Sequence, residues 1–269
     1  MSTPTDVTAR VNYIAPDAPP PELAWREPRE GEVFHAPQWA EHAVKIKDIR
    51  GQEDAFSLDE HGFAVIDFDV DVDPEAELGC LEVDYFPRAL AAVKKASGAR
   101  DAIAFDHNYR RAGVSYDRVA DAPAMHVHND YTDISAERRI RDMLGQDLAE
   151  QRLAQRYCYI NLWRPIRHKA EDLPLAVLAS ASIGADDFVK CMMRWPDRDG
   201  ETYVLKHNPA HQWFYLSNME PNRALLLKCF DTELDGRARF APHSAFVNPA
   251  SPTDAKPRES FEVRTIAFF

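Results

Sequence analysis

The stretch Met125-His126-Val127-His128-Asn129-Asp130-Tyr131-Thr132 places three potential metal ligands within five residues. In an extended strand, alternate side chains lie on one face, so His126, His128 and Asp130 point toward one place. An imidazole and a carboxylate at i and i+2, completed by one distant histidine, make the three-ligand facial set of non-haem iron oxygenases, which leaves coordination positions open. An isolated H-x-H or H-x-D pair is more often made of ordinary polar strand residues, so this interpretation needs support from the rest of the chain.

Two later segments supply that support. The segment Ala241-Pro242-His243-Ser244-Ala245-Phe246 offers the distant histidine, and fifteen residues after His243 the pair Arg258 and Ser260 stands at i and i+2 of an expected terminal strand. A guanidinium binds a carboxylate through two charge-assisted hydrogen bonds, and a neighbouring hydroxyl adds a third. Taken singly, His243 is more often a packed or solvated histidine and Arg258 a salt-bridge residue. Their order in the chain predicts a clamp for a dicarboxylate cosubstrate beside a metal.

Composition limits the partners of the protein. With 269 residues, of which 45% are hydrophobic, the chain can bury a sizeable core, and we favour one domain. The 32 basic and 44 acidic residues give a net charge of −12, which argues against nucleic acid and anionic membranes as partners. No apolar run approaches the roughly 20 residues of a membrane span, and the polar start has no hydrophobic signal region, so we expect a cytoplasmic protein. The four cysteines form no C-x-x-C pair and indicate neither a zinc knuckle nor a disulfide framework.

The amino-terminal segment is rich in proline. Pro16, Pro19, Pro20, Pro21 and Pro28 block regular hydrogen-bonded structure and favour an extended conformation. Extended arms of this kind often lie across their own domain or a partner subunit. We therefore expect an extended arm over residues 1–30 and a single domain over residues 31–269.

The remaining chain is mostly a series of short strands. We expect one helix over Pro87–Ala96 and a surface helix of about five turns over Ala136–Gln155, because Ile140, Leu144 and Leu148 recur every four residues. The expected strands are Phe63–Asp67, Ala102–Asp106, Tyr157–Trp163, Thr202–Lys206, Gln212–Leu216, Ala224–Phe230, Ser244–Val247 and Ser260–Phe269. Short β runs separated by Pro, Asn, Asp and Gly, with few helices, predict a mainly β fold of the sandwich or barrel type. In a jelly roll, His243 and Arg258 can then meet the strand of His128 in one pocket.

Five motifs together resemble one known family. They are His126–Thr132, Asn161–Pro165, His211–Tyr215, Leu226–Asp231 and Pro257–Arg264. As a set they resemble the gibberellin GA4 desaturase and AsaB-type hydroxylase/desaturase family, which includes the cephamycin-cluster protein CmcJ, and the resemblance runs from about Tyr13 to the carboxyl terminus. Asn222-Arg223 stands where that family commonly has an acidic pair, a departure that concerns the substrate and not the metal.

The resemblance implies a fold, an activity and a set of ligands. It implies an Fe(II)- and 2-oxoglutarate-dependent oxygenase of secondary metabolism, built on a double-stranded β-helix (a cupin-like jelly roll) with flanking helices. The residues that match the family's metal ligands are His128, Asp130 and His243. Those that match its oxoglutarate clamp are Arg258 and Ser260.

Three further positions are weighed separately. His126 shares the face of His128, and we favour a role beside the metal or against the substrate over a role as a ligand. Arg164, directly before Pro165, is expected to be a cation of the pocket, so His126 and Arg164 are our candidate catalytic residues. For Arg110 and its neighbour we favour a basic pair on the surface over a contact with an anionic substrate.

The sequence leaves several functions open. An oxygenase with this site would hydroxylate, desaturate or cyclise a small molecule, and its partners would be that substrate and dioxygen. The resemblance to CmcJ, which works with a second protein, raises the alternative of an accessory subunit without catalysis. An iron oxygenase independent of oxoglutarate is a further option, and so is a zinc hydrolase with the same ligands, although the R-x-S clamp has no obvious purpose in a hydrolase. A monomer and a homodimer are both compatible with the sequence.

Overall fold

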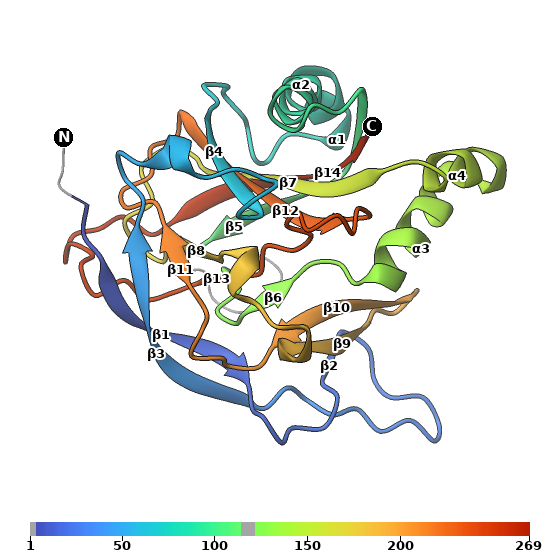
Figure 1. The fold of residues 1–269 in the computed structure, drawn as a ribbon, viewed down its shortest axis with the longest axis horizontal. Coiled ribbons are helices and arrows are strands. Elements are labelled where there is room, and N and C mark those ends of the chain that lie inside the picture. Colours follow the sequence, from blue (N-terminus) through green and yellow to red (C-terminus); the bar gives the residue numbers. More distant parts are fainter. Residues whose placement is uncertain (1–3, 114–121) are drawn as a thin grey trace.

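The computed structural model describes residues 4–113 and 122–269, which form two β-sheets with flanking helices (Figure 1). The nine-stranded sheet has the order β1 (Val7–Ile14), β3 (Trp39–Asp48), β11 (Trp213–Tyr215), β8 (Leu175–Leu178), β13 (His243–Ala245), β6 (His128–Asn129), β10 (Asp199–Leu205), β9 (Phe188–Arg194) and β2 (Glu22–Ala24). The five-stranded sheet has the order β4 (Phe63–Asp67), β12 (Arg223–Asp231), β7 (Tyr157–Pro165), β14 (Glu259–Phe268) and β5 (Asp101–Arg111). The helices are α1 (Leu78–Cys80), α2 (Phe86–Ser97), α3 (Asp133–Leu144) and α4 (Gln146–Leu153), with a π-helical turn at Leu81–Tyr85 and short 3-10 turns at Glu53–Ala55, Ser180–Ser182 and Ala185–Asp187.

The two faces of β7 show how the core is divided. All nine residues of this strand are buried, because the strand lies between two layers of side chains. Tyr159 packs in the core between the sheets, in one cluster with Phe214 of the nine-stranded sheet. Ile160, the next residue, points the other way and packs in the cluster that contains Val93 of α2. Alternation along the strand therefore separates the inner core from the core beneath α2.

The predicted strands and the first predicted helix are confirmed. Each of the eight expected strands corresponds to a strand of the structure, with ends that differ by a few residues. Helix α2 has Pro87 in its first turn and ends at Ser97, and it is capped by Gly98, whose φ of 76° is the left-handed conformation that favours glycine. It covers the outer face of the five-stranded sheet (Figure 1).

The single helix expected over Ala136–Gln155 is wrong, because the chain forms two helices there. Helix α3 ends at Leu144, and α4 begins at Gln146; Gly145 between them has φ 69° and ψ 164°, which is not helical. Because of this break, the residues expected on one apolar face do not share one face: Ile140 is buried, whereas Leu148 is 43% exposed. In the part of the chain that the structure describes, no helix is both long and apolar enough to cross a membrane.

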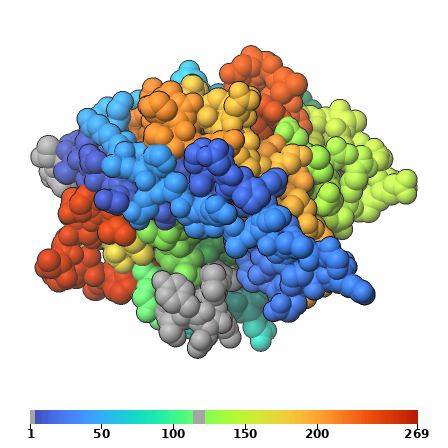
Figure 2. All heavy atoms as spheres, turned by 90° about the horizontal axis from the view of Figure 1, so that it is seen from below, coloured from blue at the N-terminus to red at the C-terminus, as the bar shows by residue number. Residues whose placement is uncertain are grey.

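The first thirty residues contribute two strands to the nine-stranded sheet. Strand β1 pairs antiparallel with β3, and β2, inside the proline-rich segment, pairs parallel with β9. Seen from below, the amino-terminal segments form a band across this face of the molecule (Figure 2). The extended segment thus lies across its own domain and is hydrogen-bonded to it. The division at residue 30 stays a prediction.

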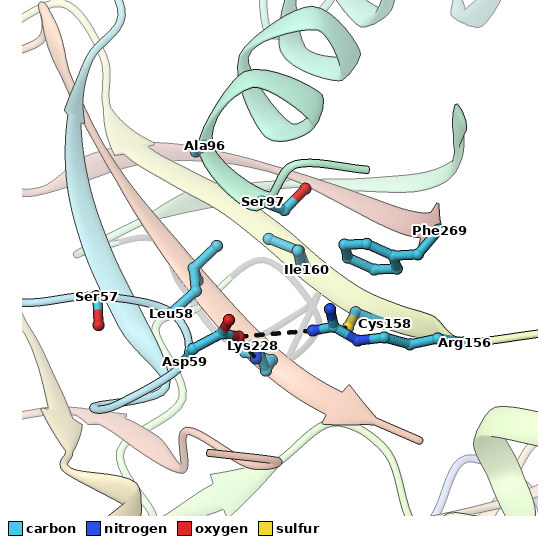
Figure 3. A pocket seen from close by; sticks show the side chains of 10 residues that line it. All are labelled: Ser57, Leu58, Asp59, Ala96, Ser97, Arg156, Cys158, Ile160, Lys228 and Phe269. Carbon is cyan, nitrogen blue, oxygen red and sulfur yellow. Dashed lines mark hydrogen bonds and ion pairs between the residues drawn. The ribbon is translucent and has the colours of Figure 1, made fainter. Parts of the chain in front are cut away.

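A buried ion network lies under the end of α2. The ammonium of Lys228, which is 1% exposed, is 2.9 Å from Asp231 and 2.6 Å from Asp59, and the Arg156 guanidinium is 2.8 Å from the same Asp231 oxygen. Three of these residues, Lys228, Asp59 and Arg156, line a cavity of about 110 Å³ (Figure 3). Burial raises the pKa of Asp231, but the hydrogen bond from Arg156 and the charge of Lys228 outweigh it and bring that pKa to about 2. Since each charged residue lining this cavity has a partner, we interpret the network as structural.

The network predicts a large loss of stability when its central carboxylate is removed. Asp231→Ala leaves the buried ammonium of Lys228 and the partly buried guanidinium of Arg156 with only the more exposed Asp59 as a shared carboxylate, so we expect the free energy of unfolding to fall by about 3 kcal/mol. Urea unfolding followed by circular dichroism measures this change. The control is Asp235→Ala, which removes an exposed carboxylate paired with Arg237, and there we expect little change. Equal effects of the two substitutions would contradict the structural role of Asp231.

Candidate metal centre

Strand pairing brings the two histidines of the predicted site together. His128 on β6 stands directly opposite His243 on β13 in the antiparallel register, and the centroids of the two rings are 4.5 Å apart. The amide of Asn129 donates to the carbonyls of Tyr131 and Cys229, at 2.8 Å each, which fixes the turn of the chain directly after His128. Asp130 follows in this turn and faces the same space as the two imidazoles.

The three candidate ligands form one cluster. One ligand atom each from His128, Asp130 and His243 lie within 4.8 Å of one another, and Nε2 of His128 is 3.7 Å from Oδ1 of Asp130. Ligand atoms that share a metal at about 2.1 Å on one octahedral face lie about 3 Å apart, so a small inward movement would complete such a site. Among the described residues this is the one group of three or more such side chains with metal-binding spacing.

Both imidazoles are oriented by the backbone. Nδ1 of His128 lies 2.9 Å from the carbonyl oxygen of His126, and Nδ1 of His243 lies 3.0 Å from that of Ala241, in each case two residues earlier in the chain. With Nδ1 as the donor, Nε2 carries the lone pair that a metal needs. Burial and the neighbouring imidazoles hold the pKa of His128 well below its usual range, so the ring is neutral, the form that binds metals.

The carboxylate of Asp130 is held from the five-stranded sheet. Its Oδ2 accepts a hydrogen bond of 2.6 Å from the Asn161 amide and lies 3.6 Å from Nη2 of Arg264 and 3.9 Å from the Cys229 thiol. Burial raises the pKa of Asp130, but the charge of Arg264, together with the hydrogen bond from Asn161, outweighs it and holds that pKa well below its usual range. The carboxylate is therefore ionised, and Oδ1 is the oxygen that faces His128.

Arg258 and Ser260 lie beside this cluster with polar atoms unpaired. Arg258, which is 2% exposed, lies over the Trp163 ring, donates through Nη1 to the Leu173 carbonyl, and has no partner for Nε among the described residues. The hydroxyl of Ser260 is also buried without a partner in the described part of the chain. Burial and the charge of Arg110 lower the pKa of Arg258. A buried cation beside an unsatisfied hydroxyl has the chemistry of a carboxylate site.

One pocket joins the two halves of the site. Its lining residues are Arg110, Ala124, His128, Asp130, Trp163, Leu175, His243, Arg258, Glu262 and Arg264. The sequence alone did not place Glu262 here or give Asn161 its contact with Asp130. Strand alternation could have indicated both positions. Ser260, Glu262 and Arg264 share one face of β14, and Arg264 stands opposite Asn161 on β7.

The structure places the two candidate catalytic residues, Arg164 and His126, outside the ligand cluster. The expectation that Arg164 is a pocket cation is wrong, because Arg164 lies on the opposite face of β7 from Trp163 and donates to the carbonyls of Phe68 and Val70. His126 is not part of the three-ligand cluster. Its ring stacks on Trp39 with centroids 4.5 Å apart, and it lies 5.1 Å from the ring of His128.

The two arginines at the end of β5, Arg110 and Arg111, point to opposite faces of the strand because side chains alternate along it. Arg110 lines the pocket, and its Nη1 donates to the Ala122 carbonyl at 2.7 Å. Arg111 is exposed. The preference for a surface pair therefore fails for Arg110, which faces inward beside Arg258.

Comparison with known proteins gives the family. Residues 11–268 match the family described as oxidoreductase/YMDC permease-like domain. The Fe(II)/2-oxoglutarate-dependent dioxygenase nvfI of Aspergillus novofumigatus is 32% identical to this chain over 95% of the chain and 94% of its own length. The hydroxylase/desaturase asaB of Aspergillus flavus is 30% identical over 84% of this chain and 80% of its own length.

A solved structure shows the same fold. The iron and alpha-ketoglutarate-dependent endoperoxidase NvfI superimposes with a TM-score of 0.87 and 29% identity, over 100% of this chain and 99% of that one. The jelly-roll prediction and the resemblance seen in the sequence are both confirmed. Together with the His, Asp, His cluster, these similarities show that the chain belongs to the Fe(II)/2-oxoglutarate-dependent dioxygenase family that includes the AsaB-type hydroxylases/desaturases.

Proposed function

We propose that this protein uses Fe(II), 2-oxoglutarate and dioxygen to hydroxylate, desaturate or cyclise a small-molecule secondary metabolite. The observation that carries the proposal is the pocket itself, in which three candidate metal ligands lie beside Arg258, a buried arginine with an unpaired Nε. The buried, unpaired hydroxyl of Ser260 lies on the same face of β14 as Glu262, which lines this pocket. Neither the metal-ligand cluster nor the pair Arg258 and Ser260 defines the reaction by itself. Together they match a cosubstrate that has a metal-chelating keto acid at one end and a carboxylate at the other.

Each residue of the pocket has a proposed role. His128, Asp130 and His243 would hold the metal, and Arg258 with Ser260 would bind the far carboxylate of oxoglutarate. When bound, Fe(II) would supply the chemistry that activates dioxygen, with oxoglutarate as the electron-donating cosubstrate, for oxidation of the small-molecule substrate. Trp163, Leu175 and the surrounding core exclude water from that region.

His126 is proposed to face the substrate. Its ring neighbours that of His128 but lies outside the ligand cluster. Stacking on Trp39 restricts its orientation. Burial lowers the pKa of His126 to about 4, so the ring is neutral at physiological pH and would serve as a hydrogen-bond partner without charge.

The alternatives fit the pocket less well. A subunit without catalysis has no need for three converging ligands whose imidazole rings are both oriented for metal binding. A zinc hydrolase or an oxoglutarate-independent iron oxygenase would leave Arg258 and Ser260 buried without a carboxylate, which costs free energy. Formation of succinate from oxoglutarate, measured with Fe(II) and oxygen, separates these classes.

A cytoplasmic location, expected from the sequence, and a homodimer, which the sequence allows, are also part of this proposal. A homodimer is tested by light scattering coupled to gel filtration. A mass of twice the 30.6 kDa chain would support it, and the mass of one chain would contradict it.

The metal assignment predicts the effect of removing each ligand. We expect His128→Ala, Asp130→Ala and His243→Ala each to abolish tight binding of Fe(II), because a facial set of three ligands has no spare donor. Anaerobic isothermal calorimetry measures the affinity. The matched control is His126→Ala, the neighbouring histidine, which should keep tight binding. Unchanged affinity in Asp130→Ala, or loss of binding in His126→Ala, would show that the ligands are misassigned.

The carboxylate clamp predicts a selective effect on the cosubstrate. Lys cannot reproduce the two-pronged contact of a guanidinium, so Arg258→Lys should raise the Michaelis constant for oxoglutarate at least tenfold, about 1.4 kcal/mol, with much less effect on iron affinity. Steady-state kinetics of oxoglutarate consumption measure it.

Arg264→Lys is the matched comparison for this clamp. Arg264 already forms ion pairs with Asp106, Asp130 and Glu262, so we expect a smaller effect on the oxoglutarate Michaelis constant. If Arg264→Lys impairs oxoglutarate use while Arg258→Lys does not, the clamp is assigned to the wrong arginine. If neither substitution matters, the protein does not use oxoglutarate in this way.

A further inference from the structure

Asn161 is a buried polar residue whose side chain makes one hydrogen bond. It is 0% exposed and lies in the middle of β7. Its Nδ2 donates to Oδ2 of Asp130 at 2.6 Å, while its Oδ1 is buried without a partner among the described residues. An amide that is taken out of water and left half satisfied costs free energy. Stability alone therefore does not account for an asparagine at this place.

The position of Asn161 in the sheet explains why it reaches Asp130. Arg264 stands directly opposite it on β14, and both side chains project into the space between the sheets. Asp130 follows β6 of the other sheet. Asn161 at 2.6 Å and Arg264 at 3.6 Å both lie on Oδ2, whereas it is Oδ1 that lies 3.7 Å from Nε2 of His128. The five-stranded sheet thus holds one oxygen of a carboxylate that belongs to the opposite sheet.

We propose that Asn161 is a positioning residue that fixes the Asp130 carboxylate so that Oδ1 alone faces the metal. The inference deepens the proposed function and rests on the metal site described there. A carboxylate can bind a metal through one oxygen or through both. A bond from Asn161 to Oδ2 keeps that oxygen occupied, so the coordination positions next to Asp130 stay open for the cosubstrates.

The substitution that tests this proposal is Asn161→Leu, which keeps the approximate size of the side chain and removes the amide. The control is Thr265→Val, which removes a buried hydrogen bond from Thr265 to the Ile160 carbonyl between the same two strands, β14 and β7, without touching Asp130. The measurements are the dissociation constant of Co(II), the visible absorption spectrum of the Co(II) complex, and the thermal unfolding midpoint of the metal-free protein. Co(II) alone is the probe, so no turnover is needed.

We expect Asn161→Leu to weaken Co(II) binding at least tenfold and to change the absorption spectrum, because groups that orient a ligand typically contribute 10- to 100-fold to metal affinity. Its unfolding midpoint should stay close to that of the wild type, since removal of the unsatisfied amide oxygen offsets the loss of the hydrogen bond to Asp130, which keeps its contact with Arg264. Thr265→Val should lower the midpoint and leave both the affinity and the spectrum unchanged. This opposite pattern cannot arise from a general loss of packing.

Failure of the inference differs from failure of the proposed function. If the wild type does not bind Co(II), the metal site itself is wrong. If the wild type binds and Asn161→Leu binds equally well with the same spectrum, Asn161 does not position the carboxylate. If Thr265→Val weakens binding as much as Asn161→Leu does, the effect belongs to the strand pair and the inference is also overturned.

Discussion

The antiparallel pairing of β13 with β6 is the constraint on which the site depends. It sets His243 directly opposite His128, although 115 positions separate them in the chain. A shift of one residue in this register would turn one imidazole to the other face of the sheet and remove the cluster. The backbone also fixes the orientation of the rings, because each Nδ1 lies within hydrogen-bond distance of the carbonyl two residues earlier. Sheet geometry thus determines both the place and the tautomer of the candidate ligands.

The second sheet contributes the charged environment. Every side chain on the inner face of β14 from Ser260 to Arg264 is polar, which is unusual for a buried strand, and Arg264 in this row pairs with Glu262 and with the carboxylate of Asp130. Arg258, at the start of this row, differs from Arg264 because it forms no ion pair with a carboxylate of the described residues and its Nε has no partner there, whereas Arg264 pairs with three carboxylates. This difference supports the proposal that Arg258 binds the cosubstrate, whereas Arg264 pairs with acidic residues of the protein itself.

Much of this arrangement could be predicted from the sequence, for reasons that are local. The H-x-D pair and the R-x-S pair each lie within one short segment, where alternation alone puts the side chains together. The sequence does not show which way Arg164 points, because β7 is buried on both faces and no solvent-exposed polar side marks which of its residues face the pocket. The prediction of one long helix is wrong because the apolar residues keep their spacing of four past Gly145, while the backbone conformation of Gly145 ends the helix there. Asn161 was missed because its partner lies on the other sheet.

The central claim is that one pocket holds Fe(II) and oxoglutarate between the two sheets. A crystal structure of the protein prepared without oxygen, with both ligands bound and with iron located by anomalous scattering, tests it most directly. We predict one iron bound by His128, Asp130 and His243, with the far carboxylate of oxoglutarate on Arg258 and Ser260. Iron on other side chains, or an oxoglutarate carboxylate paired with another arginine, would contradict the account.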